Sequence, residues 1–216
     1  MISTNQEPAS NSDSPSHVWY ASYGSNMNAE RFSHYIQGGA LTGTSRVYKG
    51  ADDKTPPLAD ALLSLPHQMY FAGESSVWTG GVAYLGHSKS EDATLSKAYL
   101  ITPNQFEQVV AEEGRRDDVP HLDIPLLLSL GRLTLGSRAY DEMLYVGEKD
   151  GFPVITFTSP REDRPYNKPA PAYLKMIALG LQDAHGLNNL EVEKYLLSKP
   201  GIKGSYTAEE LGEAIA

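Results

Sequence analysis

The ten residues VWYASYGSNM, at positions 18–27, join a strand to a helix with almost no connecting chain. Residues 18–23 are apolar or aromatic and favour a buried strand, whereas NAERFSHYIQGG, at positions 28–39, has helical spacing. The apolar side chains of this helix are Phe32, Tyr35 and Ile36. The change from a buried strand to a helix takes place within Gly-Ser-Asn. The chain must therefore adopt a fold that has a strand-to-helix corner at the edge of its core.

Such a corner can bind an anion. Several backbone N–H groups at the start of a helix have no partner within it. Gly24 permits a ligand to approach the backbone closely, and Ser25 and Asn26 add short polar side chains. These groups would lie at the positive end of the helix dipole. The alternative is a tight turn in which the asparagine only caps its own helix.

A second candidate group is Glu113, at the end of a helix expected from Thr102 to about residue 113. Thr102 can cap this helix, with Pro103 at its first position and Gln105 completing a capping box. Glu113 lies near the centre of the apolar face that the helix presents, and an inward carboxylate is a candidate general acid or base. The alternative is a frayed helix end with Glu113 in a solvated run of charges.

Tyr173 is the third candidate. It stands at the start of an amphipathic helix, directly after a polar, proline-rich connection at 161–171. Its ring can pack in the core while its hydroxyl reaches a polar partner. The alternative is a purely structural role in the core.

The remaining pattern predicts an α+β fold, with strands in the middle of the chain and helices at defined points. The region from 41 to 86 alternates short β-rich runs with Gly, Pro and Asp, which favours several short strands in a curved sheet or barrel. Further strands are expected at 93–102, 123–133, 138–148 and 152–159, and helices at 171–185 and from Asn188 and Thr207. Residues 1–17 are expected to be a disordered tail and 18–216 a single domain.

Composition excludes some chemistry and argues against some partners. The 216 residues carry a formal charge of −9, which argues against duplex nucleic acid or an anionic membrane as a partner. There is no cysteine, and the six histidines form no HxH or HExxH motif, so no metal site or cofactor is expected. No apolar run approaches the length of a membrane span, and no signal peptide is recognisable, so a cytoplasmic protein is expected.

Four blocks together resemble the γ-glutamylcyclotransferase-like family. YGSNM after an apolar strand is similar to the glycine loop of that family, and WTGGVAYL (78–85) to its Trp-x-Gly-Gly strand. SKAYLITPNQFEQVVAEEG (96–114) resembles its next strand and helix, which closes on a catalytic glutamate before a glycine. PAPAYLKMIALGLQDAHGL (169–187) resembles the segment with an active-site tyrosine. The resemblance implies a small mixed β-barrel with surrounding helices.

The resemblance also implies a reaction, in which a γ-glutamyl amine or peptide cyclises to 5-oxoproline and releases the amine without a cofactor. Glu113 would be the catalytic acid/base. The residues expected to bind the γ-glutamyl substrate are Tyr23, Gly24, Ser25, Asn26, Met27 and Tyr173. Two alternatives are a non-catalytic protein that binds a small acidic metabolite in the same pocket, and an amide hydrolase that uses water. The sequence names neither the leaving amine nor the oligomeric state.

Overall fold

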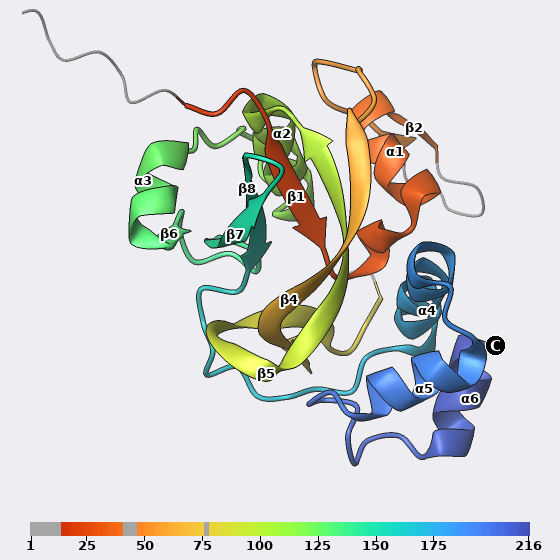
Figure 1. The fold of residues 1–216 in the computed structure, drawn as a ribbon. Helices are drawn as coiled ribbons and strands as arrows, with labels where there is room; N and C mark the ends of the chain where they lie inside the picture. The colour runs from red at the N-terminus through yellow and green to blue at the C-terminus, as the bar shows by residue number, and fades with distance from the viewer. Residues whose placement is uncertain (1–13, 41–46, 76–77) are drawn as a thin grey trace, which may run out of the picture.

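Six strands form one mixed sheet in the order β4-β5-β1-β8-β7-β6 (Figure 1). The computed structural model describes residues 14–40, 47–75 and 78–216. Its strands are β1 (Val18–Ser22), β2 (Gly39–Ala40), β3 (Val47–Tyr48), β4 (Ala59–Ala72), β5 (Val82–Ile101), β6 (Arg132–Thr134), β7 (Glu142–Lys149) and β8 (Phe152–Thr158). Its helices are the 3-10 turn η1 (Ser25–Met27), α1 (Ala29–Gln37), α2 (Pro103–Glu113), α3 (Ile124–Leu130), α4 (Pro171–His185), α5 (Asn189–Leu197) and α6 (Ala208–Ile215).

Strand β1 is at the centre of the sheet and is buried along its whole length. It pairs antiparallel with the second half of β5 and parallel with β8. Because successive side chains of a strand point to opposite faces, Trp19 and Ala21 enter one core cluster and Val18 and Tyr20 enter another. Helices α4, α5 and α6 cover the first face, and α1, α2 and α3 cover the second.

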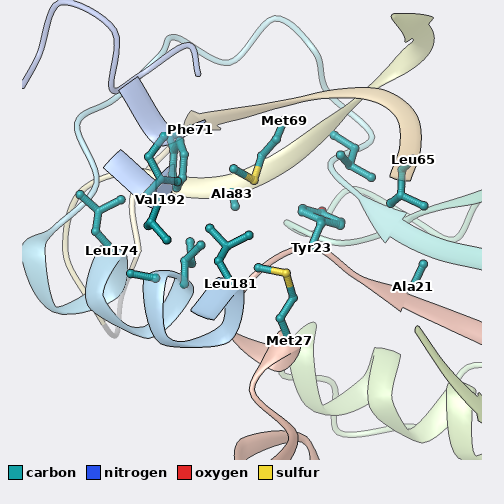
Figure 2. Close-up of a cluster of buried hydrophobic side chains, with 14 of the residues drawn as sticks. Ala21, Tyr23, Met27, Leu65, Met69, Phe71, Ala83, Leu174, Leu181 and Val192 are labelled. Carbon is teal, nitrogen blue, oxygen red and sulfur yellow. The ribbon is translucent and has the colours of Figure 1, made fainter. Parts of the chain in front are cut away.

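The first cluster contains apolar side chains from β1, β4, β5 and the three C-terminal helices (Figure 2). Met27, Leu181 and Tyr23 are among its members, so the segment after β1 packs against α4. Gly180 of α4 allows this close approach, because a Cβ atom there would lie 2.8 Å from the Cβ of Met27. The YGSN corner therefore rests on a packed helix.

The sheet curls on itself. The Thr158 hydroxyl, at the end of β8, accepts the Leu85 N–H at 2.9 Å and donates to the Leu85 carbonyl at 2.8 Å. Leu85 is in the first half of β5, whereas the second half of β5 is separated from β8 by β1. The predicted α+β class, a small mixed β-barrel with surrounding helices, is confirmed.

The region between α1 and α2 differs from the expected series of short strands. It contains two long strands, β4 with 14 residues and β5 with 20, and the strand expected at 93–102 is the second half of β5. Their register shifts on both sides of His67, and such irregularities bend a strand without ending it. Residues 41–46, where the expected series began, lie outside the described residues.

The strand expected at 123–133 is wrong over most of its length, because residues 124–130 form α3. The Asp123 side chain accepts the Leu126 N–H at 2.9 Å, Pro125 occupies the first turn, and Gly131 ends the helix with φ 76°. A short apolar run has no periodicity that separates strand from helix. Here the capping residues on either side decided the outcome.

The expected tail at 1–17 falls mostly on residues 1–13, which lie outside the described residues. Ser14 to His17 belong to no helix or strand. Since every helix from α1 to α6 packs on one of the two faces of a single sheet, we infer that 18–216 folds as one domain. No helix within the described ranges combines the length and the apolar character needed to cross a membrane.

Candidate functional site

A cavity of about 340 Å³ opens where β1 ends, and it brings together most of the residues singled out from the sequence. Its lining includes Tyr23, Gly24, Ser25, Asn26, Glu113 and Tyr173. Met27 does not line it; this side chain is buried in the core beneath the corner. We therefore leave Met27 out of the candidate site.

The corner and the carboxylate meet directly. Asn26 Nδ2 donates a hydrogen bond of 2.8 Å to Glu113 Oε1 across 87 residues of sequence. Only 3% of Asn26 is exposed, and its Oδ1 is buried without a protein partner in the described part of the chain. The helix cap is Asn28, whose Oδ1 accepts the Arg31 N–H at 2.9 Å. Asn26 is thus free of the capping role and holds Glu113.

Backbone donors at the corner also remain available. Among the described residues, no hydrogen bond joins the N–H of Ser25 or Asn26 to a protein acceptor, whereas the Met27 N–H bonds to the Gly24 carbonyl at 3.1 Å. Gly24 lies on the cavity wall 3.6 Å from the Tyr173 hydroxyl, measured from its ideal Cβ position. Two residues that line the cavity, Ser25 and Asn26, therefore have backbone N–H groups without a protein acceptor in the described part of the chain.

Glu113 is the last residue of α2, and the helix does not fray before it. Phe106, Val109 and Val110 are fully buried, as the helical wheel predicts. The chain then turns back, and the Arg116 N–H bonds to the Ala111 carbonyl at 2.8 Å. The half-buried Glu113 side chain consequently faces the cavity.

A buried ion pair fixes the chain just beyond Glu113. Arg116 Nη2 donates to Asp141 Oδ1 at 2.6 Å, and the Arg138 N–H donates to Asp141 Oδ2 at 2.9 Å. Both side chains of the pair are largely shielded from solvent. This pair ties the end of α2 to the loop that contributes Ala139 and Tyr140 to the cavity wall.

Tyr173 lies in the first turn of α4 and lines the cavity. Its hydroxyl oxygen accepts the Ala83 N–H at 3.2 Å. Burial raises the pKa of Tyr173 to about 12. The hydrogen bond from Ala83 lowers this pKa by less than burial raises it, and the Glu113 carboxylate also raises it. The hydroxyl is therefore neutral near pH 7, and its hydrogen is available for a ligand.

Arg31 lines the cavity and was missed by the sequence reasoning. It is only 6% exposed; its Nε donates to Ser25 Oγ at 3.1 Å and its Nη2 to the Tyr35 hydroxyl at 3.3 Å. Burial opposes its charge, yet Tyr35 and the carboxylate of Glu113 raise its pKa. Its position four residues before Tyr35, on the apolar face of α1, was the signal that could have revealed it.

The WTGGVAYL block contained Trp78, Val82 and Tyr84, but no local signal placed these side chains or that of Tyr140 in the cavity. Trp78, Val82 and Tyr84 come from the β4–β5 connection and the start of β5, and Tyr140 comes from the loop before β7. They reach the cavity only because the sheet curls. Among the described residues, no group of three or more His, Asp or Glu side chains is arranged to hold a metal ion.

The chain is similar in sequence to a curated plant protein and in fold to solved structures. No family model matches the sequence. Over 206 residues the chain is 34% identical to histone deacetylase 5 of Arabidopsis thaliana, in an alignment that covers 85% of this chain and 31% of that protein. The chain thus spans about a third of the length of that curated relative.

Two solved structures share the architecture. One is a γ-glutamyl cyclotransferase, with a TM-score of 0.52 and 16% identity over 92% of this chain and 98% of that one. The other is an uncharacterized protein from Homo sapiens, with a TM-score of 0.51 and 17% identity over 93% of this chain and 99% of that one. At such identities the similarity establishes the fold, which is that of γ-glutamyl cyclotransferase.

Proposed function

We propose that this chain is a γ-glutamylcyclotransferase-like enzyme that converts a γ-glutamyl amine or peptide to 5-oxoproline and a free amine. The observation that carries the proposal is the 2.8 Å hydrogen bond between Asn26 and Glu113 within one cavity. It places a carboxylate beside a corner with available N–H donors. The reaction needs these two groups for the α-carboxylate and the α-amine, which are attached to the same carbon of the substrate.

In the proposed reaction, the α-amine of the γ-glutamyl group attacks its own γ-carbonyl carbon. A new C–N bond closes the five-membered lactam, and the original amide C–N bond breaks. An α-amine has a pKa of about 7.7–8.0, so most of it is protonated at neutral pH and must lose a proton before attack. Glu113 takes this proton and gives it to the leaving nitrogen as the amide bond breaks. It then takes the second proton that the ring nitrogen must lose to become the lactam N–H and passes it to the released amine. Such a role typically contributes about 10²–10⁴-fold.

Holding the substrate in a ring-closing conformation is the larger contribution. Well-oriented intramolecular attack reaches effective molarities of about 10⁵–10⁸ M. The α-carboxylate would be held by the N–H groups of Ser25 and Asn26 and by Arg31. Arg31 suits this role because it is a buried cation that forms no ion pair with another described residue. Its binding would leave the α-amine on the side of Glu113.

Negative charge develops on the γ-carbonyl oxygen during attack, and a donor aimed at it lowers the barrier. The Tyr173 hydroxyl is well placed for this, since it is neutral and its oxygen already accepts from Ala83. The same N–H bond fixes its position. Tyr173 would therefore stabilise the oxyanion while Glu113 moves the proton.

The decisive experiment is to incubate the protein with a panel of γ-glutamyl amides and to identify the products by mass spectrometry. We expect 5-oxoproline and the free amine, and Glu113→Gln should abolish their release while the melting temperature and substrate binding persist. The neighbouring Glu112→Gln is the matched control and should remain active.

The alternatives predict different results. Release of glutamate in place of 5-oxoproline would identify an amide hydrolase. Binding without any product would identify a metabolite-binding protein. Undiminished 5-oxoproline release by Glu113→Gln would refute the role given to Glu113. The activity that the name of the Arabidopsis relative describes belongs to that longer protein.

A further inference from the structure

The cavity wall has two parts of different chemistry, and the Tyr173 hydroxyl lies next to both. On one side is the corner, with Gly24 3.6 Å from this hydroxyl when measured from its ideal Cβ position. Asn26 belongs to this corner and bonds to Glu113, and Arg31 bonds to Ser25 of the same corner. On the other side is Ala83, whose N–H bonds to the same hydroxyl at 3.2 Å.

Around Ala83 the wall is apolar and mostly aromatic. We call this part the aromatic end, defined by Trp78, Val82, Tyr84, Ala139 and Tyr140. The Trp78 ring stacks on Tyr173 with 5.9 Å between centroids and 29° between planes. The ring centroids of Tyr84 and Tyr140 lie 5.4 Å apart. Together these rings offer flat apolar surfaces.

Three polar groups beside the aromatic end already have protein partners. The Glu74 carboxylate accepts the Gly80 N–H at 2.7 Å and the Asn167 amide at 2.9 Å. The Tyr140 hydroxyl donates to the Ala83 carbonyl at 3.4 Å. Arg164 lies over the Tyr84 ring, bonds to Ser159 and does not line the cavity.

Arg115 also lines the cavity, but its side chain is exposed. Solvent therefore screens its attraction for a carboxylate on a ligand. A charged group placed at the aromatic end would lose water and gain little in return. An apolar ring there would bury its surface against other rings, which is favourable.

Building on the proposed function, we propose that the aromatic end binds the leaving amine and selects γ-glutamyl amides whose amine carries an apolar, planar group over those whose amine carries a charge. The polar end would hold the γ-glutamyl group, and the scissile amide would lie at Tyr173. The substrate class is thus a γ-glutamyl conjugate of an uncharged aromatic amine.

The test compares kcat/KM for four amides that share the γ-glutamyl group. Their amines are methylamine as the reference, phenethylamine for the ring, 1,4-diaminobutane for a cation and glycine for an anion. We expect the phenethylamide to exceed the methylamide by about tenfold or more, the scale on which apolar pockets discriminate. Both charged amides should fall below the phenethylamide.

Equal values for the phenethylamide and the methylamide would overturn the inference and leave the proposed function intact. So would a preference for the diaminobutane amide, which would mean that the rings and Glu74 bind a cation, or for the glycine amide, which would assign Arg115 to a carboxylate. An absence of 5-oxoproline from every amide would overturn the proposed function itself and this inference with it.

A pair of variants assigns the selectivity to the aromatic end. Trp78→Leu should lower the ratio of kcat/KM between the phenethylamide and the methylamide by about tenfold. Tyr166→Leu is the matched control, because Tyr166 is an aromatic residue that is 64% exposed and does not line the cavity. An unchanged ratio in a folded Trp78→Leu protein would contradict the assignment.

Discussion

At the scale of single residues, Tyr173 shows how one hydroxyl serves both the fold and the candidate site. Its oxygen accepts a hydrogen bond from the buried N–H of Ala83. Among the described residues, the hydroxyl donates no hydrogen bond of its own. The role of a buried tyrosine is thus set by its partners. The sequence indicated its position at the start of a helix but not the strand that it contacts.

Tyr173→Phe should reduce kcat by about 10²-fold, the usual effect of removing one oxyanion donor, with a smaller change in KM. It should also lower the free energy of unfolding by about 1–3 kcal/mol, because the Ala83 N–H loses its acceptor. Steady-state kinetics and urea unfolding would measure the two effects. Tyr206→Phe is the control: it removes a buried hydroxyl that donates to the Pro169 carbonyl at 2.7 Å, outside the cavity. It should lose stability but keep kcat.

The stability difference between the wild type and Tyr173→Phe has a definite dependence on pH. Burial raises the pKa of Tyr173 from 10.0 to about 12, so the fold favours the neutral phenol. The stabilisation is therefore fully present below pH 10 and is lost as the pH rises through 12. A difference that already disappears at pH 8 would contradict this account.

At the scale of elements, the contact between α4 and the corner sets the floor of the site. Met27, expected from the sequence to bind substrate, instead packs against Gly180 of α4. A glycine in the middle of a helix usually costs about 1 kcal/mol relative to alanine. Here it allows η1 to approach the helix backbone, since a Cβ would also lie 3.2 Å from the Asn28 backbone nitrogen.

Gly180→Ala should therefore destabilise the protein by about 1–3 kcal/mol despite its better helix propensity. Displacement of η1 should also weaken the hydrogen bond between Asn26 and Glu113 and lower kcat. Gly212→Ala in α6 is the matched control, because its new Cβ would meet only the flexible end of Glu193, at 3.3 Å. Thermal melts should show a lower melting temperature for Gly180→Ala and an unchanged one for Gly212→Ala. Equal melts would mean that the α4 contact does not set the position of the corner.

At the scale of the whole molecule, an ion pair that is buried only on its lysine side joins the C-terminal helices to the long strands. Lys199, which follows α5 and is 1% exposed, contacts Asp92 of β5 at 2.7 Å and lies 4.4 Å from the centroid of the Tyr195 ring. Burial works against the charge on Asp92, but hydrogen bonds from Lys199 and Gln68 outweigh it and lower the pKa of this carboxyl. The Asp92 side chain is 37% exposed to solvent.

The two halves of this pair should not be equivalent. Asp92→Ala leaves a buried ammonium without its partner and should cost about 3 kcal/mol or more. Lys199→Met should cost less, because the remaining carboxylate can be hydrated. Urea unfolding of both variants would measure the asymmetry, and a larger loss for Lys199→Met would contradict it. Because the folded pKa of Asp92 is lowered, its contribution is present above the unfolded value of 3.8 and is lost as the pH falls through the folded value.

The sequence by itself determined the features that depend on neighbours within one helical turn. Three capping boxes are present, those of Thr102 with Gln105, Asn188 with Glu191 and Thr207 with Glu210. The predicted apolar face of α2 is also confirmed, because Phe106, Val109 and Val110 are buried. The resemblance gave the fold and named the corner and Glu113 as partners. Their roles in catalysis stay predictions.

Tertiary structure decided which of these pieces share a cavity. The bond between Asn26 and Glu113 spans 87 residues, and Trp78, Tyr84 and Tyr140 reach the same space from three other positions in the chain. Local propensity carries no information about such distances, because they follow from the pairing of β1 between β5 and β8 and from the curl that brings Thr158 to Leu85. Adjacent residues determine where the turns and helix caps form, whereas the cavity forms only when the sheet closes around it.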